Sequence, residues 1–166
     1  MLANFSQEPS YTKKRVAELC RIAADHLANS KTEFEEFMIK REEHGNKIHR
    51  ANYEIRQIEG ELMFAEDDLN IAMNSIEMIE KGFQHGSFGA RQRKTLADME
   101  YQAKLMKKKM DSLQKRKEKI QETLKDLQSH EDYYWKPEEE VQREDLEQSI
   151  QALAKLKITL NQAGRM

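Results

Sequence analysis

Apolar residues recur at alternating steps of three and four along most of the chain, which is the a/d pattern of packed helices. The first series of these positions reads Ile48, Ala51, Ile55, Ile58, Leu62, Ala65, Leu69, Ala72, Ile76 and Ile79. The same frame extends backward through Val16, Cys20, Ala23, Leu27, Ser30, Phe34, Phe37, Arg41 and His44. A second series reads Leu96, Met99, Ala103, Met106, Met110, Leu113, Lys117, Ile120, Leu124, Leu127, Glu131 and Tyr134. The pattern predicts two long helices that meet along these positions.

Three glycines, Gly82, Gly86 and Gly89, separate the two series. Glycine adopts positive φ without strain, so it can end a helix and let the chain reverse. We therefore expect an all-α fold, a long antiparallel two-helix coiled-coil hairpin with its tip at these glycines.

Folding the chain at this loop predicts a register in which the numbers of facing residues sum to about 172. Ile76 then lies opposite Leu96, and the polar residue Arg41 lies opposite Glu131. Charge supports the same pairing. Residues 91–119 hold eleven basic and four acidic residues, whereas residues 53–81 hold eight acidic and two basic residues. Opposite charges on facing helices favour this partner and orientation.

Two further boundaries divide the chain. Residues 1–10 lack the helical pattern and predict a flexible tail before a first arm at 11–82; the tip loop spans 83–89 and the second arm 90–135. Pro137 disfavours helical backbone before it and predicts a kink or break before a C-terminal helix at 137–163. The apolar stripe of that helix reads Leu146, Ile150, Leu153, Leu156 and Leu160. It either continues the second arm or folds back to form a short three-helix bundle.

The residues that could carry chemistry do not form a recognisable site. The five histidines lack the spacing that places metal ligands on one helix face, and no phosphate-binding loop occurs. We expect no enzyme activity, no cofactor, no metal and no small-molecule substrate. The basic stretch 104–119 lacks interleaved aromatic residues and faces an acidic arm, so a nucleic-acid-binding hairpin is a lesser alternative. The net charge is −2 and no membrane-spanning stretch is visible, which favours a cytoplasmic protein with protein partners.

The two ends of the hairpin carry the candidate partner-binding residues. At the tip, aromatic and basic side chains predict a docking surface, unless the phenylalanines instead pack over the last seam layer. These tip residues are Phe83, His85, Phe88, Arg91 and Arg93. At the terminal end the candidates are Lys13, Lys14, Arg15 and Arg21. An aromatic cluster of Phe34, Phe37, Tyr133, Tyr134 and Trp135, with Phe37 opposite Tyr134, is expected to be structural.

The second arm resembles a known family. The stretches Leu105–Met110 and Leu113–Ile120, followed by Asp132-Tyr133-Tyr134-Trp135, are similar to the second arm of the small stalk proteins of bacterial type III secretion, the SctO/FliJ type. The resemblance covers about a third of the chain. Members of that family are cytoplasmic antiparallel coiled-coil hairpins.

The resemblance implies a non-enzymatic stalk that couples the secretion ATPase to the export gate. Its terminal end would enter the centre of the hexameric ATPase, its tip would reach the export gate, and export chaperones could be further partners. The alternative is an oligomeric coiled-coil scaffold or chaperone of a phage or bacterium. That alternative depends on apolar residues outside the a/d frame of the first arm, which are Met38, Ile39, Met63, Phe64, Ile71, Met73 and Met78.

Overall fold

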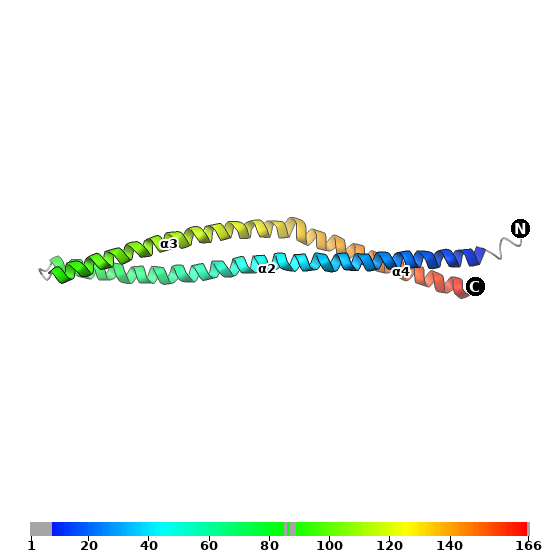
Figure 1. Cartoon of the computed structure of the whole chain (residues 1–166), viewed down its shortest axis with the longest axis horizontal. Helices are drawn as coiled ribbons and strands as arrows, with labels where there is room; N and C mark the ends of the chain where they lie inside the picture. Colours follow the sequence, from blue (N-terminus) through cyan, green and yellow to red (C-terminus); the bar gives the residue numbers. More distant parts are fainter. Residues whose placement is uncertain (1–7, 85, 87–88, 166) are drawn as a thin grey trace. The chain divides into compact units, whose positions relative to one another are not determined.

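The protein is an all-α helical hairpin. The computed structural model describes residues 8–84, 86 and 89–165, and these residues include no β-strand. Helix α2 spans Glu8–Gln84, α3 spans Ala90–His130, a π-helix η1 spans Glu131–Trp135, and α4 spans Lys136–Arg165. Figure 1 shows α2 as one continuous ribbon, in keeping with the absence of proline between Pro9 and Pro137.

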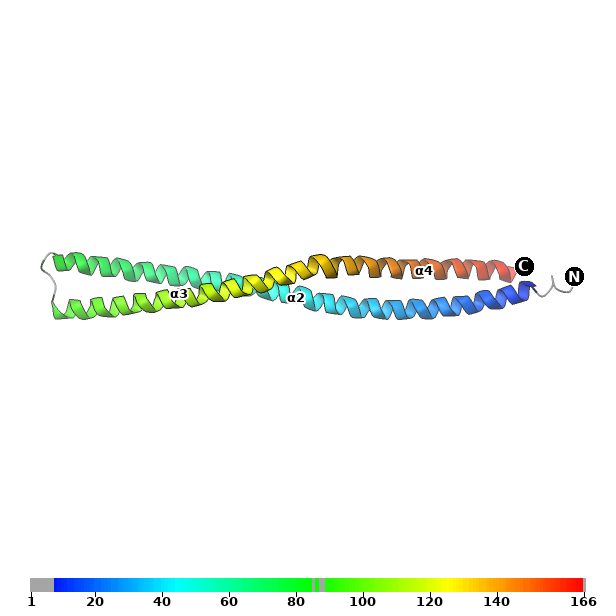
Figure 2. The same cartoon turned by 90° about the horizontal axis from the view of Figure 1, so that it is seen from above.

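Two compact units share helix α2. Unit 1 comprises Met1–Gly45 and Ser129–Met166, and unit 2 comprises Asn46–Gln128. Within each unit the two chain segments lie side by side and run antiparallel (Figure 2). Unit 1 therefore pairs the first half of α2 with η1 and α4, and unit 2 pairs the second half of α2 with α3.

The core of unit 2 is the seam that the three-four spacing predicts. Every a/d position from Ile48 to Ile79 is buried or half-buried. One cluster of this seam joins Ala72, Ile76 and Ala103, with Leu69, Leu96 and Met99 packed against it. Ile76 and Leu96 thus belong to the same layer, as the predicted register requires. The polar seam residue Lys117 forms an ion pair with Glu59 of α2, with 3.3 Å between the Lys117 Nζ and the Glu59 Oε1.

The seam changes phase by one residue at η1. Up to Glu131 the predicted positions of the second series face α2, but the next half-buried residue is Trp135, and Tyr134 is 43% exposed. The inward positions then continue at steps of three and four through Glu139, Gln142, Leu146, Ser149, Leu153, Leu156 and Leu160. Our placement of Tyr134 and Ile150 in the seam was therefore wrong, and Ile150 is 46% exposed.

A π-helix accommodates such an extra residue because its hydrogen bonds span five residues instead of four. Here the N–H of Lys136 bonds to the carbonyl oxygen of Glu131. Without the extra residue, Asp145, Ala152 and Lys155 would turn inward in place of Leu146, Leu153 and Leu156. The wide turn also ends just before Pro137, which has no N–H and would crowd a carbonyl of a regular helix. The chain neither breaks nor folds back at Pro137, because α4 packs against α2 in unit 1.

Several expected boundaries move by a few residues. Helix α2 begins at Glu8, so residues 8–10 are helical, and residues 1–7 of the expected tail lie outside the described residues. Phe83 lies in the last turn of α2 and not in the tip loop. Helix α4 spans Lys136–Arg165, slightly longer than the expected 137–163.

The reversal after α2 uses two glycines. Gly86 has φ +79°, and its N–H donates to the carbonyl of Phe83 at 3.1 Å. Gly89 caps α3: its N–H donates to Oε1 of Gln92 at 3.0 Å, and its carbonyl accepts from the N–H of Arg93 at 3.1 Å. A side chain three residues into the helix thus satisfies the capping residue's N–H, as in one half of a capping box.

Candidate functional site

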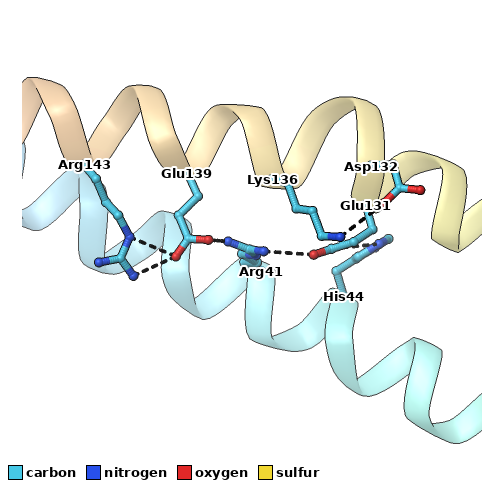
Figure 3. Close-up of polar contacts among 7 residues, drawn as sticks. All are labelled: Arg41, His44, Glu131, Asp132, Lys136, Glu139 and Arg143. Carbon is cyan, nitrogen blue, oxygen red and sulfur yellow. Dashed lines mark hydrogen bonds and ion pairs between the residues drawn. The ribbon is translucent and has the colours of Figure 1, made fainter.

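A half-buried ionic cluster in unit 1 is the most distinctive arrangement of side chains in the described structure (Figure 3). Arg41 on α2 donates from Nη2 to Oε1 of Glu131 on η1 at 2.9 Å, and its Nη1 contacts the carboxylate of Glu139 on α4. Arg143 also donates to Glu139, from Nη2 at 2.7 Å. The Nε2 of His44 lies 3.7 Å from Oε2 of Glu131. Two carboxylates and two guanidinium groups therefore balance in one chain of ion pairs along the helices.

A cluster of aromatic rings adjoins the ionic cluster at His44. His44 stacks on Trp135 with ring centroids 5.3 Å apart, and Phe37 packs against the same indole at 5.5 Å. His130 lies 5.6 Å from His44 and stacks on Tyr134 at 5.2 Å. Trp135 is thus the central ring, and its buried Nε1 has no hydrogen-bond partner among the described residues.

Part of this arrangement was predictable. The Arg41–Glu131 pair is confirmed, whereas Phe37 meets Trp135 instead of Tyr134. Phe34 lies beneath the guanidinium of Arg143, at 5.4 Å from Cζ to the ring centroid. The sequence interpretation placed His44 in the seam but missed its ring contacts and the roles of His130 and Glu139. The contacts of Trp135 and Glu139 with α2 depend on the one-residue shift at η1. A signal was present, since the step from Glu131 to Leu146 is one residue longer than an unbroken heptad frame permits.

The ionic cluster can stabilise a register, because each of its carboxylates is paired with a guanidinium group. An unpaired charge among these half-buried residues would be costly, so the ion pairs specify which residues of α2 and α4 meet. We therefore treat this cluster as structural and look to the exposed surfaces for function.

The four basic residues expected at the terminal end, Lys13, Lys14, Arg15 and Arg21, are all exposed on α2. The structure adds two apolar residues that the a/d pattern excluded. Leu19 and Ile22 are exposed and line a shallow groove together with Lys14, Arg15 and Glu18. We call the four basic and two apolar residues, which are Lys13, Lys14, Arg15, Leu19, Arg21 and Ile22, the terminal surface. Their side chains suit a partner that offers carboxylates around an apolar contact.

The tip candidates are only partly described. Phe83 is exposed in the last turn of α2, and Arg91 and Arg93 are exposed in the first turn of α3. His85 and Phe88 lie outside the described residues. The described tip candidates therefore lie in the last turn of α2 and the first turn of α3.

A second groove in unit 1 is polar. Small seam residues, Ala23, Ser30 and Ser149, leave space between α2 and α4, and His26, Glu33, Glu138 and Asp145 line its walls. Across the described residues, no three His, Cys, Asp or Glu side chains are grouped so that they could hold a metal ion. The helices of the described part of the chain are also too polar for any of them to cross a membrane.

No family model matches this chain, and neither a curated protein nor a solved structure does so.

Proposed function

We propose that this protein is a non-enzymatic coiled-coil stalk or adaptor of a bacterial type III export apparatus that couples the secretion ATPase to the export gate. The resemblance of residues 105–120 and 132–135 to stalk proteins of that apparatus motivates the proposal. The observation that carries it is the terminal surface, where four exposed basic residues and two exposed apolar residues gather on the first turns of α2.

The helical pairs suit a coupling element. Each unit is held by a mainly apolar seam, and close packing along it resists movement of one helix relative to the other. Arg41 and Lys117, both in that seam, are neutralised by carboxylates of the facing helix. The described side chains available for outside contacts therefore lie at the ends and on the flanks of the helices.

The test is binding to a purified hexameric type III secretion ATPase, measured by biolayer interferometry. Replacing Lys13, Lys14, Arg15 and Arg21 with glutamate should abolish binding, and raising the salt concentration should weaken binding of the wild type. The matched control reverses four exposed lysines of α3, which are Lys104, Lys107, Lys108 and Lys115. This control changes the net charge equally and should leave ATPase binding intact.

A second binding experiment tests which end of the proposed stalk contacts which partner. Phe83→Ser should leave ATPase binding unchanged and weaken binding to the cytoplasmic domain of the export gate. Loss of ATPase binding in Phe83→Ser alone would reverse the assignment of the two ends. Salt-sensitive binding to nucleic acid without ATPase binding would contradict the stalk proposal altogether.

A further inference from the structure

Three large apolar residues of α2 stand exposed at a spacing of seven in unit 2. Phe64 is 68% exposed, Ile71 is 65% exposed and Met78 is 74% exposed. Residues seven apart lie on the same face of a helix in this kind of pairing, so these three form one stripe. An exposed apolar stripe of this length is typical of an interaction surface.

The heptad frame places this stripe on one side of the seam. Leu62 and Leu69 occupy heptad position a of α2, so the three residues of the stripe occupy position c. Counting in the same way from Leu96 and Ala103, which occupy position a of α3, puts Leu105 at position c. A shallow groove of unit 2 confirms which positions share a side. It is lined by g and c positions of α2 (Lys47, Arg50 and Glu54), a g position of α3 (Thr123) and the seam residues Ala51, Ile120 and Leu127.

The exposed Leu105 therefore flanks the seam on the same side as the stripe. The core cluster sets residues 69–76 opposite residues 96–103, so Leu105 lies level with the segment between Phe64 and Ile71. We call this surface, formed by the g and c positions of α2 and α3 in unit 2, the g-side face.

The g-side face is divided by charge. Its α2 half carries the exposed carboxylates Glu54, Glu61 and Asp68. Its α3 half carries the exposed basic residues Lys109, Arg116 and Lys119. Over residues 54–78 every charged g or c position of α2 is acidic, and over residues 102–119 every charged g or c position of α3 is basic. Beyond these ranges the face also carries Lys47, Arg50, Asp98 and Asp126.

We propose that a second copy of this chain covers the g-side face, related to the first by a two-fold axis parallel to the helices. This operation lays α2 of each copy over α3 of its partner, so acidic residues meet basic ones and the partner's Leu105 enters between Phe64 and Ile71. A two-fold axis perpendicular to the helices would instead place α2 on α2, with carboxylates facing carboxylates. Charge therefore selects the first arrangement, which is self-complementary as an isologous dimer requires.

This inference uses different residues from the proposed function, although a dimer through Phe64, Ile71 and Met78 is also what the scaffold alternative requires. The g-side face belongs to unit 2, whereas the proposed ATPase contact is the terminal surface in unit 1. The dimer describes the free protein, and its failure would leave the ATPase test unaffected.

Sedimentation velocity of the full-length chain tests the proposal. The wild type should be a dimer at micromolar concentration, and Phe64→Ser with Ile71→Ser should raise the dissociation constant by more than about tenfold. Both side chains are exposed, so circular dichroism should show an unchanged helix content. The matched control is Met63→Ser with Met73→Ser, which removes two methionines that are 59% and 45% exposed but lie at b and e positions on the other side. This control should remain a dimer.

The orientation is tested by disulfide formation between two single-cysteine variants in a Cys20→Ser background. Ile71→Cys and Leu105→Cys should form a covalent dimer when mixed under mild oxidation, and neither should do so alone. A wild type that is monomeric up to about 100 µM, well above the micromolar range of ordinary associations, would overturn the proposal. A dimer that survives the Phe64/Ile71 change, or a disulfide formed by Ile71→Cys alone, would overturn it as well.

Discussion

Arg41 donates a 2.9 Å hydrogen bond to Glu131, ninety residues further along the chain, from within the seam of unit 1. The pair fixes the axial register of unit 1. Sliding α2 by one heptad would move the guanidinium away from Glu131 and Glu139 and set it near Leu124 or Leu146. Leaving a buried charge unpaired costs about 3–5 kcal/mol, so slipped registers are disfavoured.

Removing the arginine should therefore destabilise the protein. We expect Arg41→Ala to lower the free energy of unfolding by about 1–3 kcal/mol, because two half-buried carboxylates lose their donor. Urea unfolding followed by circular dichroism measures this change. The control is Arg50→Ala on the same helix, whose exposed side chain should contribute less than about 0.5 kcal/mol. Equal effects of both substitutions would contradict a register-fixing role for Arg41.

We expect the π-helix to contain one residue more than unbroken heptad spacing between α3 and α4 would require. Deleting the exposed Tyr133 in a Pro137→Ala background should let α3 and α4 join as one regular helix with Trp135 and Leu146 still facing α2. We expect a melting temperature close to that of Pro137→Ala alone. Deleting the exposed Lys108 in the same background should be far more damaging, because it rotates the following seam away from α2. Similar losses from both deletions would show that η1 has another role.

Trp135 should contribute most of the packing in the aromatic cluster. It contacts Phe37, His44 and Tyr134, so Trp135→Ala should cost about 3–5 kcal/mol as a large-to-small change. Tyr133→Ala should cost much less, because Tyr133 is exposed. Chemical denaturation measures both changes. Trp135 is the only tryptophan, so its fluorescence in the wild type also reports unfolding of unit 1. A Trp135→Ala protein as stable as the wild type would contradict the packing argument.

The stability of the protein should be sensitive to substitution of Gly86 in the hairpin turn and tolerant of substitution of Phe83. Gly86→Ala places a Cβ at φ +79° and should lower stability by about 1–2 kcal/mol, although the Cβ would meet no other atom. Phe83→Ser should cost less than about 1 kcal/mol, because the ring is largely exposed. Thermal melts compare the two variants. A larger loss at Phe83 than at Gly86 would indicate that the ring packs over the seam and is not free to dock a partner.

Much of the fold could be read from the spacing of apolar residues. The a/d positions from Val16 to Ile79 are all buried or half-buried, and so are those from Leu96 to Glu131. This succeeded because helical periodicity is a local property and two stripes joined by a glycine turn have few ways to bury each other. The Arg41–Glu131 pair followed from the same register, because the position of the turn sets which residues face each other.

The tertiary structure alone decided what happens beyond Glu131. The sequence contains one residue too many between Glu131 and Leu146, but local pattern does not say where a helix absorbs it or whether Pro137 breaks the chain. Packing against α2 settles both questions, since only a wide turn at η1 brings Trp135 onto His44, Glu139 onto Arg41 and the leucines of α4 into the seam. The cluster of His44, His130 and Trp135 likewise joins residues far apart in sequence, and no periodicity within one helix could have shown it.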